Sequence, residues 1–201
     1  FGVMHGYMKI PELKKVCHAY GVSINEYLVA VYVWSVYTEC MHGMPSERPV
    51  RVAVPVNLRP YFNSITTKNF FVMVSAEFHP TKEIYTFEEV LKSVSESLRS
   101  QISRENLEKL FSYNVSNEKL LAARIVPLFL KNLAMRYVYT TSALANTATV
   151  TNIGNISVSE EYRPYVEMFH AFLAMSKGQH LKGTICSYGD TLVFSFSYDL
   201  T

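Results

Sequence analysis

Charge of one sign is the first thing this sequence lacks. Its 201 residues include 19 basic and 17 acidic ones, a formal net charge of +2, and the longest basic clusters are pairs such as Lys14-Lys15. Proteins that bind nucleic acid or anionic membranes use dense patches of Lys and Arg. The composition therefore predicts no nucleic-acid partner and gives no electrostatic basis for membrane binding.

Cysteine is also scarce. The three cysteines, Cys17, Cys40 and Cys186, are odd in number, far apart and contain no CxxC pair. This pattern fits neither a disulfide framework nor a zinc site, and it predicts buried, reduced thiols in a cytoplasmic protein. The six histidines form no HxxH, HxxxH or HExxH pair, so no metal site is predicted. His170, inside an apolar run, is expected to be a core residue.

Long hydrophobic runs are missing as well. Ser, Thr, Pro or charged residues interrupt every apolar stretch well before the ~18 residues that a membrane-spanning helix needs. No signal-peptide pattern is present. The sequence therefore predicts no transmembrane segment, and we expect a cytoplasmic location.

What the sequence does contain is a large apolar fraction, 49% of its residues, which is enough for a sizeable core. Two helix starts are marked by the S/T-x-x-E capping box, at Ser23–Glu26 and Thr86–Glu89. The first box opens a predicted helix over 24–41 that is apolar nearly all round and hence buried. The second opens one over 87–102 with a single apolar stripe.

Two further helices and a set of strands complete the predicted fold. Residues 10–21 predict a short helix ended by Gly21, and a helical region over 117–137 is broken or kinked by Pro127. Apolar, β-branched runs predict strands over 48–56, 69–78, 148–152, 166–175, 182–188 and 191–199. The predicted fold class is α/β, a two-layer sandwich of a mixed β-sheet with helices mainly on one face.

The last two predicted strands meet at Gly189-Asp190, which favours a tight hairpin. In the second of them, Phe194 and Phe196 share one face while Ser195 and Ser197 share the other. That alternation is typical of a sheet covered on one side only.

The first candidate motif is VPVNLRPYF, where an apolar strand ends at Val56 and is followed by Asn57 and Arg59. The guanidinium of Arg59 is a planar set of donors suited to a carboxylate or a phosphate. It could equally pair with an acidic group of the chain itself across the strand end.

The second candidate motif is TATVTNIGNIS, a β-branched strand that ends in hydrogen-bonding groups. In one interpretation Gly154 forms a turn with positive φ, and Asn152 and Asn155 satisfy that turn. In the other, Thr151 and Asn152 present donors to a ligand, as a hydroxyl or an amide does when it stabilises a tetrahedral oxyanion. Spacing alone does not choose between the two.

The order of these elements resembles the C-terminal half of the CoA-dependent acyltransferase superfamily. That superfamily includes chloramphenicol acetyltransferase, alcohol acetyltransferases, wax-ester synthases and condensation domains of peptide synthetases. The resemblance covers nearly the whole chain and rests on VPVNLRPYF together with TNIGN. Asn152 and Gly154 match the superfamily's S-N-x-G signature, with Thr151 where serine is commoner.

The resemblance implies that residues 1–201 form the C-terminal subdomain of a two-half enzyme with a tunnel between the halves. The general-base histidine of the superfamily belongs to an H-H-x-x-x-D motif in the N-terminal half, and this sequence contains no adjacent histidines. Thr151, Asn152 and Gly154 would then lie at the tunnel wall. Arg59 would fix that wall or a loop beside it, a role preferred to contact with a CoA phosphate.

The implied function is half of an acyltransferase that moves an acyl group from acyl-CoA, or from pantetheine on a carrier protein, to a small alcohol or amine. Acyl-CoA would be a cosubstrate, with no tightly bound cofactor, and the chain alone would be inactive. The alternative is a non-catalytic scaffold of the same fold that binds a partner or an acyl group. The face that the other half would cover predicts that the isolated chain can associate with itself.

Overall fold

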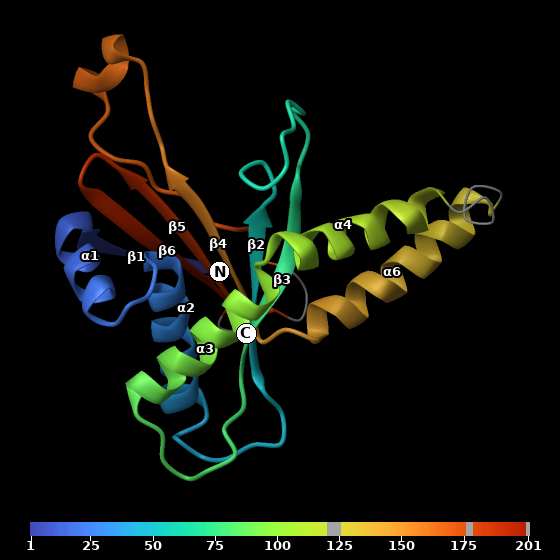
Figure 1. Ribbon diagram of the computed structural model, residues 1–201, viewed down its shortest axis with the longest axis horizontal. Coiled ribbons are helices and arrows are strands. Elements are labelled where there is room, and N and C mark those ends of the chain that lie inside the picture. The colour runs from blue at the N-terminus through green and yellow to red at the C-terminus, as the bar shows by residue number, and fades with distance from the viewer. Residues whose placement is uncertain (120–125, 176–178, 200–201) are drawn as a thin grey trace.

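The computed structural model describes residues 1–119, 126–175 and 179–199, and its centre is a six-stranded mixed sheet (Figure 1). The strand order is β1-β6-β5-β4-β2-β3. The β5–β4 and β4–β2 pairs are parallel, and the other neighbours are antiparallel. The strands are β1 (Gly2–Lys9), β2 (Val50–Asn57), β3 (Phe71–Phe78), β4 (Ala148–Asn155), β5 (Leu181–Tyr188) and β6 (Thr191–Tyr198).

Three helices cover one face of this sheet: α1 (Ile10–Ala19), α2 (Ile24–Ser35) and α3 (Phe87–Gln101). Both predicted capping boxes are present, and Gly21, with φ +65°, follows α1. The predicted fold class, a mixed sheet with helices mainly on one face, is confirmed. The predicted helix over 24–41 changes character after Ser35, where a π-helical turn, η1 (Val36–Cys40), continues it.

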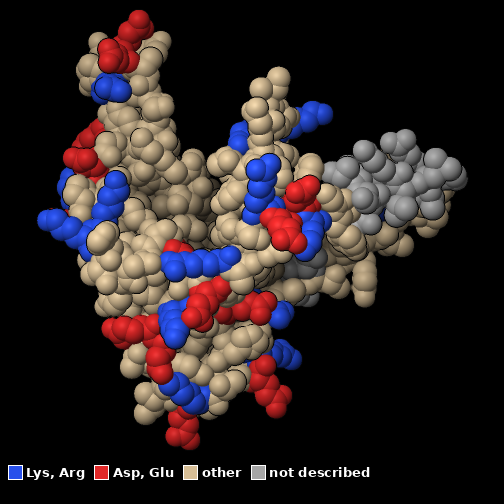
Figure 2. Space-filling view, in the orientation of Figure 1, with Lys and Arg blue, Asp and Glu red and all other residues tan. Residues whose placement is uncertain are grey.

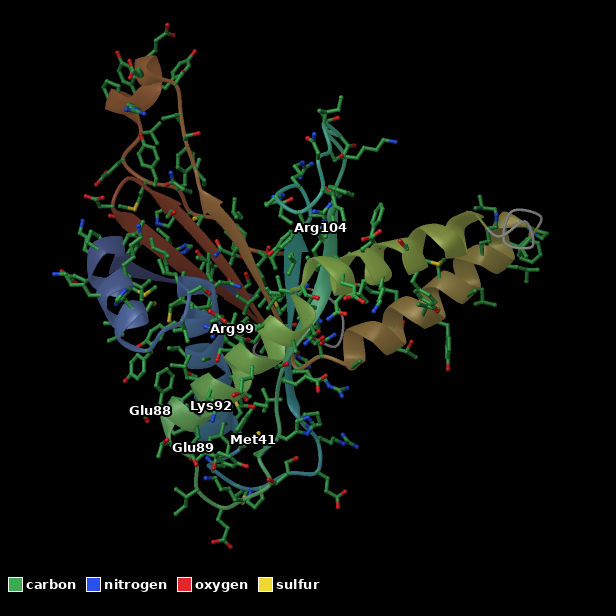
Figure 3. The ribbon with its side chains drawn as sticks, viewed as in Figure 1. Met41, Glu88, Glu89, Lys92, Arg99 and Arg104 are labelled. Atoms are coloured by element: carbon green, nitrogen blue, oxygen red, sulfur yellow. The ribbon has the colours of Figure 1, made fainter. Side chains whose placement is uncertain are left out.

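The layers are held together by alternate side chains of the strands. Every second residue of β2 and β3 points to the helices, and most of these residues are buried, as Val52 and Val74 are. An ion pair ties the helices to one another: Arg99 on α3 (Figure 3) donates from Nε to Glu26 Oε1 of α2 at 2.5 Å. Burial works to raise the pKa of Glu26, but hydrogen bonds from Arg99 and Ser23 outweigh it and hold that pKa below its usual value.

The outer edge of β3 is capped by side chains of α3. Gln101 accepts from the Ser75 N–H at 3.1 Å and donates to the Ser75 carbonyl at 2.7 Å, while the Ser97 hydroxyl accepts from Glu77 N–H at 3.1 Å. A bare strand edge exposes unpaired backbone groups. Here the helix supplies the partners that another strand would supply.

Two helices, α4 (Arg104–Lys119) and α6 (Leu128–Leu144), project away from the sheet (Figure 1). Pro127 immediately precedes α6, so the predicted break at this proline is confirmed, although residues 120–125 of the predicted helical region lie outside the described residues. Several large apolar side chains of α6, among them Phe129 and Tyr137, are exposed. Within the described ranges, no helix is long and apolar enough to cross a membrane.

One strand was missed and one strand prediction was wrong. β1 was missed because its sequence, GVMHGYMK, holds two glycines and little β-branched character. Residues 166–175, predicted to be a strand, are not part of the sheet. The place between β4 and β5 is not open to them, because β4 and β5 pair directly with each other. The segment, with the 3₁₀ turn η2 (Glu160–Tyr165) before it, is instead part of the crossover from β4 to β5.

This 166–175 segment lies over the face of β5 and β6 that is opposite the helices. The Cys186 thiol donates to the Phe169 carbonyl at 3.3 Å, and Lys182 Nζ donates to the Ala174 carbonyl at 2.9 Å. Ser195 and Ser197 are therefore fully buried, and the expectation of a sheet covered on one side was wrong at this end. The predicted burial holds for Cys17 and Cys186 but is wrong for Cys40, which is exposed on η1.

Candidate functional site

A pocket of about 370 Å³ lies at the end of the sheet where β2 and β4 finish. Because these two strands are parallel neighbours, their carboxyl ends meet at one edge. Four of the five predicted site residues line this pocket: Asn57 at the end of β2, Arg59 just after it, and Thr151 and Asn152 on β4. The structure thus brings together two motifs that lie about a hundred residues apart in the sequence.

Two arms rise from the sheet, the β2–β3 loop and the β4–β5 crossover (Figure 1). Residues of both arms line the pocket. The β2–β3 loop and β3 contribute Phe70, Phe71 and Met73 to its wall, and the crossover contributes Leu173. In Figure 2 the hollow between the arms is almost free of Lys, Arg, Asp and Glu. An apolar recess with a few polar groups at its floor suits a small organic ligand.

Thr151 offers the pocket an uncommitted hydroxyl. Its side chain is half-buried, and it has no hydrogen-bond partner within the described part of the chain. Thr149, two residues earlier on the same face, differs because its hydroxyl accepts from Gln179 at 3.5 Å. Accepting that bond leaves the Thr149 O–H free, so both threonines can donate to a bound molecule, and Thr151 is the one whose hydroxyl makes no bond to the described residues.

Asn152 and Gly154 instead shape the strand. Gly154 has φ +83°, the conformation that the turn interpretation requires, and its N–H donates to Asn152 Oδ1 at 2.8 Å. The β4–β5 register shifts between Asn152 and Gly154, so a β-bulge leaves Ile153 unpaired. The Asn152 amide group also lies 3.5 Å from Asn25 Oδ1 at the start of α2. Gly154 is outside the pocket lining and acts on the pocket through the backbone of β4.

Arg59 uses its guanidinium on the chain itself. Nη2 donates to the carbonyls of Thr66 at 3.1 Å and Lys68 at 2.8 Å, both in the β2–β3 loop. Asn57 Oδ1 accepts from the Arg59 N–H at 3.1 Å, which closes a turn at the end of β2. The contacts of Arg59 are those of a residue that holds the loop beside the pocket.

A row of polar side chains, missed in the sequence, runs from Thr151 across the sheet. Thr151 pairs in register with Thr184 of β5, Thr184 with Ser195 of β6, and Ser195 with His5 of β1. The Ser195 hydroxyl and His5 Nδ1 share a hydrogen bond of 2.8 Å, whereas the Thr184 hydroxyl is buried without a partner among the described residues. The alternation along each strand shows which face a residue takes. The register between strands, which aligns these residues in a row, cannot be predicted from one sequence.

His170, on the 166–175 segment, lies beside the β1 end of this row. Its ring lies 4.6 Å from that of His5, and its Nε2 lies 3.0 Å from the Tyr7 hydroxyl. The expectation that His170 is a core residue was wrong, because it is exposed on the 166–175 segment. Burial raises the pKa of the Cys186 thiol beneath the same segment, which makes this cysteine a poor nucleophile. No cluster of three His, Cys, Asp or Glu that could hold a metal occurs among the described residues.

Comparison with known proteins identifies the fold. No profile of a known protein family and no curated protein sequence matches the chain. Among solved structures, the wax ester synthase/diacylglycerol acyltransferase from Marinobacter aquaeolei VT8 superimposes with a TM-score of 0.54 at 16% identity, over 96% of this chain and 41% of that one. Polyketide synthase associated protein 5 from Mycobacterium tuberculosis gives 0.60 at 10% identity, over 100% and 48%.

The starter condensation domain of rhizomide synthetase gives a TM-score of 0.51 at 9% identity, over 98% of this chain and 40% of that one. The chain therefore has the fold of acyltransferase and condensation domains, as predicted, and spans less than half of each of these structures. At such identities the likeness establishes the fold, and function must be argued from the site.

Proposed function

We propose that this chain is one half of an acyltransferase that moves an acyl group from CoA, or from carrier-bound pantetheine, to an alcohol or an amine. The observation that carries the proposal is the meeting of VPVNLRPYF and TNIGN at one pocket, in a fold shared with acyltransferase and condensation domains. Each motif is weak in the sequence by itself. Because both motifs line the same pocket, together they support a single binding site.

In this proposal, Thr151 donates a hydrogen bond to the oxyanion that develops when the acceptor attacks the thioester carbonyl. Its hydroxyl lines the pocket and has no other partner in the described residues. A donor aimed at developing charge is among the strongest devices of enzyme catalysis. Asn152 and Gly154 position the end of β4, and Arg59 positions the facing loop.

The general base would come from the N-terminal half of the longer protein, in the H-H-x-x-x-D motif that the resemblance implies. That histidine takes the proton of the acceptor hydroxyl or amine while the new C–O or C–N bond forms. The C–S bond then breaks and the thiolate of CoA or pantetheine leaves. The alcohol acetyltransferase branch is preferred, because nothing in the sequence points to a carrier-protein assembly line.

The test is thiol release from acetyl-CoA and from longer acyl-CoAs, with a panel of alcohols and amines, by residues 1–201 and by the full encoded protein. We expect activity only in the longer protein. Pantetheine-loaded carrier protein is tested in parallel as the other donor. Silence of the full protein with every donor would overturn acyl transfer and favour the non-catalytic scaffold.

A further inference from the structure

A second cavity, of about 460 Å³, lies on the other face of the sheet from the candidate site. It opens between β1 and β6 on one side and α2 with η1 on the other. Its walls are mostly apolar and include Leu28, Val31, Phe194 and Phe196. The sheet separates this cavity, here called the helix-face cavity, from the pocket that holds Thr151.

One polar side chain of the wall is buried without a partner. Tyr32 of α2 is only 3% exposed, and its ring stacks on Phe196 at a centroid distance of 6.2 Å and an angle of 12°. Its hydroxyl makes no hydrogen bond to any of the described residues. Burial raises the pKa of Tyr32, so the phenol stays protonated and able to donate. A buried hydroxyl left unpaired costs free energy, and a bound oxygen atom would remove that cost.

The mouth of the helix-face cavity indicates the charge of the ligand. Ser35, Glu39 and Cys40 line the cavity and are exposed, and the last two lie on the π-helical turn. Such turns occur frequently at functional sites. Glu39 is the one charged group among the described residues of the lining, so a carboxylate ligand would meet repulsion and no cation.

We infer that the helix-face cavity binds a neutral, mainly apolar molecule with a single oxygen, such as a primary alkyl alcohol, whose oxygen pairs with the Tyr32 hydroxyl. An alcohol oxygen can both accept from the phenol and donate to it. The alkyl chain would replace water on the faces of Phe194 and Phe196. This site does not depend on the proposed acyl transfer, since it lies across the sheet and needs no acyl donor.

The exposed thiol of Cys40 provides a readout at the mouth. The full encoded protein is treated with a maleimide with or without 1-decanol, and modification of Cys40 is followed by mass spectrometry of its peptide. We expect 1-decanol to slow this modification in a saturable way, and decanoate to do so at least tenfold less well. Tyr32→Phe keeps the ring and removes the hydroxyl, and it should weaken protection by about 2- to 10-fold.

Two serine variants provide matched controls. Ser35→Phe fills the mouth and should abolish protection, whereas Ser100→Phe places the same side chain at an exposed position of α3. Both serines donate only to carbonyls of their own helix in the structure, so both variants test the same local change. Ser100→Phe should retain protection.

Three results would overturn the inference. One is a full protein in which 1-decanol gives no protection. Another is a Cys40 that does not react even without ligand, because other parts of the protein then occupy the mouth. The third is protection unchanged in both Tyr32→Phe and Ser35→Phe. Loss of acyl transfer with intact decanol protection would count against the proposed function alone.

Discussion

Thr151 and Thr184 lie opposite each other on β4 and β5, yet their hydroxyls lie in different environments. The first reaches the pocket, while the second is 2% exposed and has no hydrogen-bond partner in the described chain. One cross-strand pair therefore combines a hydroxyl that lines the pocket with a hydroxyl that is buried in the sheet. The two can be tested separately because neither bonds to the other.

Under the proposed function, Thr151→Ala made in the full encoded protein should slow acyl transfer by about one to three powers of ten, because it removes the proposed oxyanion donor. The rate of thiol release at saturating acyl-CoA is the measurement, and circular dichroism checks folding. Thr191→Ala, at the start of β6 and outside the pocket lining, is the matched control and should leave the rate unchanged. A well-folded Thr151→Ala variant with the normal rate would remove the oxyanion role.

Thr184→Val should leave stability unchanged or raise the free energy of unfolding by up to about 1 kcal/mol. The two side chains have nearly the same shape, and valine has no hydroxyl to bury unpaired. Urea unfolding measures the change. Ser195→Ala is the contrasting variant, because Ser195 bonds to His5 at 2.8 Å, and it should cost about 1 kcal/mol. A loss above ~1 kcal/mol in Thr184→Val would mean that Thr184 has a partner after all.

The elements predicted correctly are those with strong local signals. Both capping boxes are reciprocal bonds between residues three apart, so four letters of sequence specify them. The Gly189 turn, with φ +57°, is local in the same sense. The strand prediction over 166–175 was wrong because an apolar run does not show what it packs against, and here the run is a crossover segment that lies on the sheet face, half-buried or exposed along its length.

The candidate site divides in the same way. The sequence identified four residues at strand ends: Asn57, Arg59, Thr151 and Asn152. The parallel pairing of β2 and β4 makes them neighbours. What the sequence could not provide is the register that aligns Thr151 with Thr184 and Ser195. It also could not show that the 166–175 segment lies over this face of the sheet, where Thr184 and Ser195 are buried, since both features depend on contacts between distant parts of the chain.

Replacing Arg99 with methionine should lower the free energy of unfolding at pH 7 by about 1–2 kcal/mol. A fully buried pair would cost 3–5 kcal/mol, but the Arg99 side chain is 57% exposed. Urea unfolding measures the loss. Lys92→Met is the control on the same helix, because its ion pair with Glu96 is exposed and long, at 4.0 Å, and it should change stability by less than about 0.5 kcal/mol.

The pH dependence of Arg99→Met follows from Glu26. In the natural protein the Glu26 pKa is held low, so its contribution to stability is complete above the unfolded-state pKa and is lost as the pH falls through the folded one. Without Arg99, burial raises the pKa of Glu26. Acidification then protonates Glu26 and removes its unpaired charge, which reduces the destabilisation of the variant. The stability difference should therefore shrink between pH 7 and pH 4, and a difference independent of pH would contradict this account.

Gln101→Ala should lower the free energy of unfolding by about 1–2 kcal/mol, because it leaves the Ser75 N–H without its partner and weakens the bonding of the Ser75 carbonyl. Hydrogen exchange at the Ser75 amide should accelerate together with this loss, which ties the effect to the edge of β3. Gln101→Glu keeps the acceptor for the Ser75 N–H but not the donor for the Ser75 carbonyl. Its free energy of unfolding should therefore lie between those of Gln101→Ala and the natural protein. Ser100→Ala, which bonds only to its own helix, should stay within about 0.5 kcal/mol of the natural protein. Unchanged exchange at Ser75 in Gln101→Ala would show that solvent, and not α3, satisfies this edge.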